Sequence, residues 1–133
     1  MNAASGQAHI LIVDDEENMR HMLSNMLKRD GYAVATAADG QQALSHLQTH
    51  GADYVLCDIR MPGMDGMAFL KAVQSANQTP TIIMMSAYGT IDLAVEAMRL
   101  GAYDFISKPF KSDEVRLAIK KAEERDRLKK ENL

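Results

Sequence analysis

Acidic, hydroxyl and ammonium side chains follow four of the short apolar runs in this sequence of 133 residues. If these runs are parallel strands, their carboxyl ends lie at one edge of a sheet, where ligands of such sheets bind. Three carboxylates in one crevice repel one another and raise their own pKa values unless a cation lies between them. In chain order, the residues concerned are Asp14, Asp15, Asp58, Ser86 and Lys108.

The donor set of this cluster predicts a hard divalent cation. Oxygen ligands without histidine or thiolate favour Mg2+, with Mn2+ or Ca2+ as alternatives. The three carboxylates, one divalent ion and Lys108 sum to zero formal charge. A carboxylate beside such an ion can attack phosphorus and form an acyl phosphate, because phosphoryl transfer needs mainly positioning and charge neutralisation. Ser86 and Lys108 are then the donors able to approach the added phosphoryl charge.

Short apolar runs alternate with segments of helical periodicity, and this alternation predicts the fold class. Strands are expected at residues 9–13, 32–36, 54–57, 81–85 and 104–107. A helix follows each run, and Asp39, Thr90 and Ser112 are placed to begin the second, fourth and fifth helices. Five strand–helix units in series predict a doubly wound α/β domain with a parallel sheet and helices on both faces.

Composition and charge indicate the class of protein. Hydrophobic residues make up 47% of the chain and charged residues 25%, as in an ordinary soluble domain. The net charge of -3 gives no reason to expect direct nucleic-acid binding. No apolar run approaches the ~20 residues of a membrane span, and residues 1–8 lack signal-peptide features. The single cysteine, Cys57, suits a reducing compartment, so a cytoplasmic protein is expected.

Two further features leave more than one interpretation. Almost every residue from 120 to 131 is charged with mixed signs, which favours a solvated helix, with a linker helix or a dimer contact as the alternative. The histidines are scattered over the predicted strands and helices, and we interpret none of them as a metal ligand or phosphodonor. These histidines are His9, His21, His46 and His50.

Four short motifs, in order and each at a predicted strand end, identify a family. With them, residues 8–125 resemble the receiver domain of two-component response regulators. The resemblance implies a flavodoxin-like (CheY-like) fold, whose five-stranded parallel sheet has the order 2-1-3-4-5. The motifs are Asp14-Asp15, then Asp58 followed by Met61-Pro62-Gly63-Met64-Asp65-Gly66, then Ser86-Ala87, and last Lys108-Pro109-Phe110.

The resemblance assigns roles to the acidic cluster. It makes Asp58 the phosphoacceptor, Asp15 a direct Mg2+ ligand and Asp14 a ligand that usually acts through water. The backbone carbonyl of Arg60 would complete the protein ligands. Lys108 stands where the family has its phosphate-binding lysine.

Other residues match switch, tuning and docking positions of the family. Ser86 stands where the family has Ser or Thr, and Phe105 matches the aromatic residue that swings inward on activation. Arg60 and Tyr88 lie where the family tunes the lifetime of the phosphoryl group. The positions at which the family docks its kinase are occupied by Met19, Met22 and Pro109.

Residues 86–90 and 97–105 resemble one subgroup more closely, the receivers of NtrC-type regulators that activate sigma-54 promoters. This implies a sensor histidine kinase as partner and an ATPase and a DNA-binding domain downstream, with a homodimer as a further option. The expected organisation is a flexible N-terminus at 1–7, a receiver domain at 8–122 and a charged helix extension at 123–133. That extension resembles the start of a linker to the downstream domains.

The expected function is a phosphorylation-controlled interaction module rather than a turnover enzyme. Phosphorylation is expected to remodel the face made by the fourth helix, fifth strand and fifth helix. Alternatives are a stand-alone receiver acting through protein contact, a Mg2+-dependent phosphatase or phosphotransferase, and a pseudo-receiver used for dimerisation. Arg60 stands two residues after the nucleophile and cannot serve as the general acid that the phosphatase requires, and the intact acidic cluster disfavours the pseudo-receiver.

Overall fold

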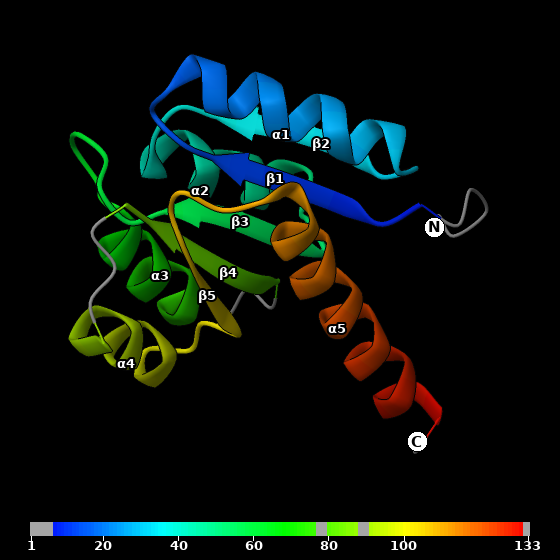
Figure 1. The fold of residues 1–133 in the computed structure, drawn as a ribbon. Coiled ribbons are helices and arrows are strands. Elements are labelled where there is room, and N and C mark those ends of the chain that lie inside the picture. The colour runs from blue at the N-terminus through cyan, green and yellow to red at the C-terminus, as the bar shows by residue number, and fades with distance from the viewer. Residues whose placement is uncertain (1–6, 77–79, 88–90, 132–133) are drawn as a thin grey trace.

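Strands and helices alternate along the whole described part of the chain. A computed structural model describes residues 7–76, 80–87 and 91–131. Within these residues the order of elements is strand then helix, repeated five times (Figure 1). The elements are β1 His9–Val13, α1 Glu17–Arg29, β2 Ala33–Ala37, α2 Gly40–Thr49, β3 Tyr54–Asp58, α3 Gly66–Ser75, β4 Thr81–Ser86, α4 Ile91–Arg99, β5 Asp104–Ser107 and α5 Ser112–Glu131.

The strands form one five-stranded sheet in the order β2-β1-β3-β4-β5. Every neighbouring pair is parallel. This confirms the predicted fold class and strand order, and β2 lies at an edge as expected. The prediction of β2 at residues 32–36 was wrong by one residue. The Tyr32 N–H donates to the Leu27 carbonyl at the end of α1, so the ladder with β1 starts at Ala33.

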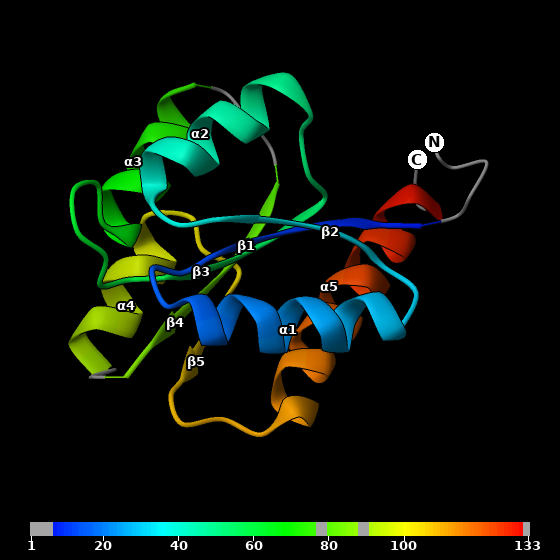
Figure 2. The same ribbon diagram turned by 90° about the horizontal axis from the view of Figure 1, so that it is seen from above.

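Helices cover both faces of the sheet, as the alternation predicted. Figure 2 shows α2, α3 and α4 on one side and α1 with α5 on the other. Each side has its own core, since alternate strand residues point to opposite faces. Val55 and Phe69 belong to the first core, and Leu56 and Ile119 to the second. The two cores make the strand ends a rigid frame for the residues that follow them.

Aspartate side chains cap the N-termini of two helices. The Asp39 side chain accepts from the Gln42 N–H at 2.9 Å, which confirms the predicted N-cap of α2. Asp65 caps α3 in the same way, accepting from the Ala68 N–H at 2.9 Å. The last helix begins at Ser112 as predicted. Thr90, the expected cap of α4, lies outside the described residues.

Helix α5 has 20 residues and projects beyond the body of the domain at its C-terminal end (Figure 1). Most residues from 120 to 131 are exposed, as expected of a solvated helix, but one side of the helix contacts the domain. The Tyr32 hydroxyl donates to Glu123 Oε1 at 2.9 Å, and the Tyr54 hydroxyl donates to Asp126 Oδ2 at 3.1 Å. These contacts hold α5 against the amino ends of the strands. Among the described residues, no helix combines the length and apolarity needed to cross a membrane.

Candidate functional site

Three aspartates meet at the carboxyl edge of the sheet. Asp14 and Asp15 follow β1, and Asp58 is the last residue of β3. One carboxylate oxygen of each lies within 4.8 Å of the others, and no second cluster of this kind occurs in the described part of the chain. Asp14 and Asp58 are buried, whereas Asp15 is exposed. The cluster is therefore open to solvent on the side of Asp15.

Lys108, the residue directly after β5, contacts the cluster through its ammonium group. Its Nζ lies 3.0 Å from Asp14 Oδ2 and 3.4 Å from Asp58 Oδ2. Its backbone N–H donates to the Ser86 carbonyl at 2.9 Å, which ties the end of β4 to the residue after β5. Burial alone would lower the pKa of Lys108, but the hydrogen bond to Asp14 and the charges of both carboxylates raise it. The ammonium group therefore stays charged.

Asp58 has a carboxylate that the protein alone does not fully stabilise. Burial raises its pKa, and the nearby charge of Asp14 adds to the effect. Lys108 and the backbone N–H of Arg60 act in the opposite direction without cancelling it. A positive charge beyond that of Lys108 would lower the free energy of the ionised form.

Asp14 is already engaged by the protein at both carboxylate oxygens. Its Oδ1 accepts from the Glu16 N–H at 2.9 Å, and its Oδ2 accepts from Lys108. Asp15 and Asp58 therefore have more carboxylate oxygens left for an ion than Asp14 has. With one ammonium, the three carboxylates leave two negative charges, and an all-oxygen site of that charge suits Mg2+.

Gly66 permits the close approach of α3 to the end of β3. A Cβ at this position would lie 2.3 Å from the Asp58 carbonyl oxygen and 2.7 Å from the Ile59 Cα. The Gly66 N–H donates to the Ile59 carbonyl at 2.8 Å, which holds the loop after β3. The sequence pattern around Gly66 indicated only a turn-rich loop, because the contact depends on how α3 packs.

The remaining predicted residues lie around this cluster. Ser86 is buried at the end of β4, and Phe105 is half-buried in β5, packed against the core on the α2–α4 side. The Arg60 side chain is exposed. Tyr88 lies outside the described residues. The expected docking residues differ in exposure, being half-buried at Met19 and exposed at Met22 and Pro109.

The fold and the site together define a doubly wound α/β domain with a cluster of three carboxylates and one lysine at the carboxyl edge of its sheet. Comparison with known families agrees with this class. Residues 10–120 match the family described as "Response regulator receiver domain". The chain belongs to the response regulator receiver family.

Individual relatives support the same assignment. The chain is 43% identical over 122 residues to the regulatory protein AtoC of Escherichia coli, covering 92% of this chain and 26% of AtoC. It is 41% identical to sporulation initiation phosphotransferase F of Bacillus subtilis, covering 84% of this chain and 90% of that protein. A crystal structure of NtrX from Brucella abortus superposes with a TM-score of 0.86 at 38% identity, covering 94% of this chain and 28% of NtrX. The chain thus spans about a quarter of AtoC and NtrX.

Membership of the family sets the kind of activity. A receiver domain is a phosphoacceptor regulatory module that partners histidine kinases, and it is not a conventional turnover enzyme. The cluster of Asp14, Asp15 and Asp58 is consistent with the Mg2+ site of such domains.

Proposed function

We propose that this domain is a signalling switch that accepts a phosphoryl group from a sensor histidine kinase on Asp58 in a Mg2+-dependent reaction. The observation that carries the proposal is the convergence of Asp14, Asp15, Asp58 and Lys108 at one edge of the sheet. Asp15, Asp58 and the Arg60 carbonyl are the proposed ligands of Mg2+, with Asp14 acting through water. When bound, Mg2+ supplies neutralisation of the charge around Asp58.

The transfer step follows from the placement of the side chains. An Asp58 carboxylate oxygen attacks phosphorus, the bond from phosphorus to the donor nitrogen breaks, and the donor imidazole leaves with the electron pair and takes up a proton. Lys108 lies 3.4 Å from Asp58 Oδ2 and can pair with a phosphoryl oxygen. Ser86 stands on the neighbouring strand, where Met85 is the register partner of Asp58, and is the proposed hydroxyl donor to the same group.

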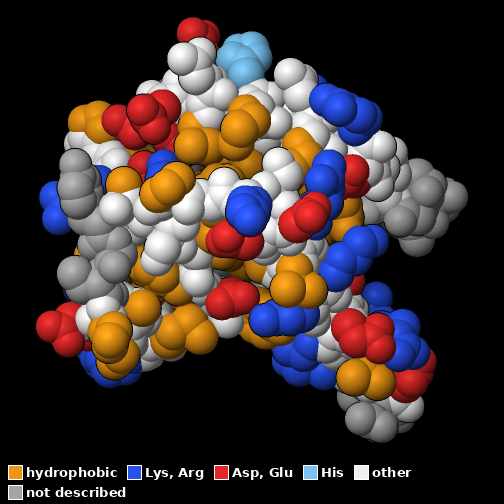
Figure 3. Space-filling model, viewed as in Figure 1, with side chains coloured by type: hydrophobic (Ala, Val, Ile, Leu, Met, Phe, Trp, Pro, Cys, Tyr) orange, Lys and Arg blue, Asp and Glu red, His pale blue; other side chains and the backbone are white. Residues whose placement is uncertain are grey.

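The signal is proposed to leave through the face made by α4, β5 and α5. Movement of Ser86 and Phe105 toward the phosphorylated site would shift the population between two packings of this face. Figure 3 shows hydrophobic side chains over α4 at the lower left and mixed charges along α5 at the lower right. Ile91, Val95 and Met98 are 82%, 59% and 45% exposed along one side of α4. These positions are one turn apart, so a partner can bind them together.

We assign the output to transcription activation in a longer NtrC-type protein, in which residues 123–133 begin a linker to an ATPase and a DNA-binding domain. The similarity to AtoC over 26% of its length supports this organisation, with residues 8–122 as the receiver domain. In this proposal the receiver itself does not touch nucleic acid and works in the cytoplasm, where its buried thiol stays reduced.

A second candidate is a stand-alone receiver that acts through protein contact. The observation in its favour is the match to sporulation initiation phosphotransferase F, of which the chain covers 90%. Both candidates share the phosphorylation chemistry, and they differ in what binds the α4–β5–α5 face.

The test of the shared chemistry is the intact mass after incubation with acetyl phosphate, with and without Mg2+. The wild-type protein is expected to gain one phosphoryl group only when Mg2+ is present, and Asp58→Asn is expected to gain none. Asp65→Asn is a matched control because Asp65 lies in the same loop but caps α3. Phosphoryl uptake that survives Asp58→Asn would sink the assignment.

A further inference from the structure

The loop between β3 and α3 lies against glycine at two points. At its end, Gly66 packs closely on Asp58 and Ile59. Earlier in the loop, Met64 lies against Gly40, the first residue of α2. A Cβ on Gly40 would lie 2.8 Å from Met64 Cγ, 3.0 Å from Met64 Sδ and 2.9 Å from the Met64 carbonyl oxygen. The start of α2 and this loop therefore touch with no room for a side chain between them.

The tip of the loop is exposed. Pro62 and Gly63 are both exposed, and Gly63 has a φ of 73°, a left-handed conformation that helps the chain to reverse direction. On one side the loop borders a hollow of about 410 Å³, lined in part by Arg60 and Asp65. Met64 is half-buried and packs against the core on the α2–α4 side. Its side chain therefore attaches the returning half of the loop to the domain.

The start of α2 is fixed by hydrogen bonds of its own. The Asp14 N–H donates to the Ala37 carbonyl at 3.1 Å, which joins the end of β1 to the end of β2. The Ala38 N–H donates to Gln42 Oε1 at 2.9 Å, and the Gln42 N–H donates to Asp39 Oδ1 at 2.9 Å. These bonds leave the first turn of α2 little freedom to move away from the loop. A side chain added at this contact would therefore displace the loop.

A displacement of Met64 would reach the acidic cluster over a short path. Asp65 follows Met64, and the next residue, Gly66, donates its N–H to the Ile59 carbonyl at 2.8 Å. That carbonyl belongs to the peptide group that joins Ile59 to Arg60. The position of Met64 is thereby linked to the orientation of Arg60, whose carbonyl is the proposed backbone ligand of Mg2+.

We propose that the contact between Gly40 and Met64 positions the loop for Mg2+ binding, so that Gly40 is a positioning residue for the metal site without touching the ion. The inference rests on the proposed function, because it takes Asp15, Asp58 and the Arg60 carbonyl as the protein ligands. Packing requires glycine at the start of α2, since its φ lies outside the left-handed region. Replacing residues that hold metal ligands in place commonly weakens metal binding by about 10- to 100-fold.

The test is titration of metal-free protein with MgCl2, followed by amide resonances. Gly40→Ala is expected to raise the Kd of Mg2+ about tenfold, because its Cβ would push the Met64 carbonyl and with it the loop. Alanine favours helix more than glycine does, so without this contact the substitution would stabilise α2 and leave the Kd unchanged. Gln41→Ala is the matched control, because Gln41 is exposed in the same turn of α2, and it is expected to bind like wild type.

Met64→Ala removes the side-chain part of the contact and adds no bulk. It is expected to raise the Kd as well, and it decides the matter if Gly40→Ala does not fold. Circular dichroism in EDTA separates a loss of affinity from a loss of stability. In wild type, the Met64 methyl resonance and the Gly40 amide resonance are expected to shift when Mg2+ binds.

Two results would overturn the proposal. The first is a folded Gly40→Ala variant that binds Mg2+ as tightly as wild type. The second is a Gln41→Ala variant that loses as much affinity as Gly40→Ala, because the effect would then belong to the first turn of α2 in general. A wild-type protein that does not bind Mg2+ would instead overturn the proposed function, and this inference with it.

Discussion

Asp58 is the residue at which the requirements of folding and of signalling conflict. Its raised pKa comes first from burial, with the charge of Asp14 adding to it. An acid whose pKa is raised in the folded state contributes stability at pH values below its ordinary pKa. That contribution is lost as pH rises through the raised value. At neutral pH without a cation, the ionised Asp58 therefore lowers the free energy of unfolding.

Replacing this carboxylate should stabilise the metal-free domain. In EDTA at pH 7, Asp58→Asn is expected to have a higher Tm than wild type, and its advantage should shrink as pH falls toward the ordinary range of an aspartate. Mg2+ at about one hundred times its Kd should stabilise wild type by about 2.7 kcal/mol and the variant by less. Thermal unfolding monitored by circular dichroism between pH 4 and 7 measures both effects. Equal Tm values at pH 7 would contradict this account of Asp58, and Asp92→Asn, on exposed α4, is the control.

At the level of secondary structure elements, α5 is held by side chains from β3 and β4 and from the residues directly before β2 and β5. Arg125 Nη2 donates to Thr81 Oγ1 at 2.7 Å, and its guanidinium carbon lies 4.3 Å from the centre of the Tyr103 ring. Together with the tyrosine bonds to Glu123 and Asp126, these contacts hold about one turn of the helix, from Glu123 to Asp126, against the domain. Tyr103 lies directly before β5, so its contact with Arg125 joins the start of β5 to α5.

Removing one of these bonds should loosen the helix measurably. Tyr54→Phe loses the hydrogen bond to Asp126 and is expected to lower the free energy of unfolding by about 1 kcal/mol at pH 7. Burial and the bond to Asp126 raise the pKa of Tyr54, so its contribution is present below pH 10 and is lost as pH rises further. Urea unfolding at pH 7 and above pH 10 should show the difference between variant and wild type shrinking. Tyr103→Phe, which keeps the ring under Arg125, should behave like wild type at pH 7.

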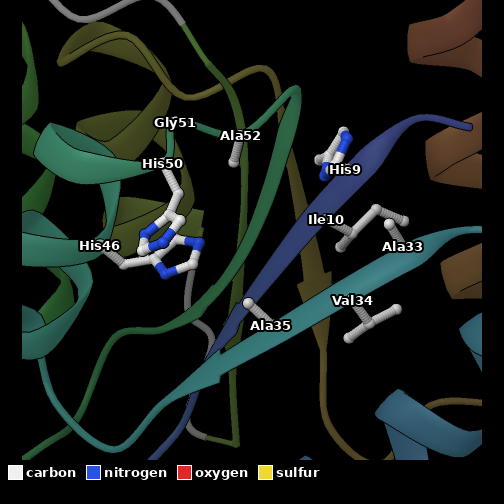
Figure 4. Close-up of a pocket in the computed structure, with 9 residues that line it drawn as sticks. All are labelled: His9, Ile10, Ala33, Val34, Ala35, His46, His50, Gly51 and Ala52. Atoms are coloured by element: carbon white, nitrogen blue, oxygen red, sulfur yellow. The ribbon is translucent and has the colours of Figure 1, made fainter. Parts of the chain in front are cut away.

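The strand and helix pattern could be predicted from sequence because it depends on local periodicity and on turn residues. Asp58 and Lys108 could be placed at one edge because the carboxyl ends of parallel strands must meet there. The hydrogen bond between Tyr32 and Glu123 joins residues 91 positions apart, so no local sequence pattern could predict it. His9 and His46 line one pocket (Figure 4) only because β1 and α2 pack together, and this proximity also left no local signal.

At the scale of the whole molecule, the two ends of the sheet have different chemistry. The carboxyl end holds buried carboxylates and a lysine, whereas the amino end holds imidazoles and the tyrosine contacts to α5. The α4–β5–α5 face runs between these ends and carries exposed apolar side chains on α4. In the proposed switch, a phosphoryl group at the carboxyl end acts on this face.

Phosphorylation should leave a regional signature in the amide spectrum. Acetyl phosphate with Mg2+ is expected to move resonances across residues 86–120, with small changes around His46 and His50. A heteronuclear amide spectrum recorded before and after phosphorylation, with Asp58→Asn as the control, measures this. Unchanged resonances across residues 86–120 in a sample shown by mass to be phosphorylated would contradict the proposed population shift.

The single thiol, on Cys57, gives a way to measure opening of the sheet. Cys57 precedes Asp58, is fully buried and donates its S–H to the Asp58 carbonyl at 3.3 Å. Burial first, and then the charges of Asp58 and Asp14, raise its pKa well above the ordinary value. Since a thiol reacts as the thiolate, an alkylating reagent can modify it only after β3 separates from its neighbours. The alkylation rate therefore reports how often the strand that carries Asp58 opens, and an ion or phosphoryl group that favours the closed sheet slows it.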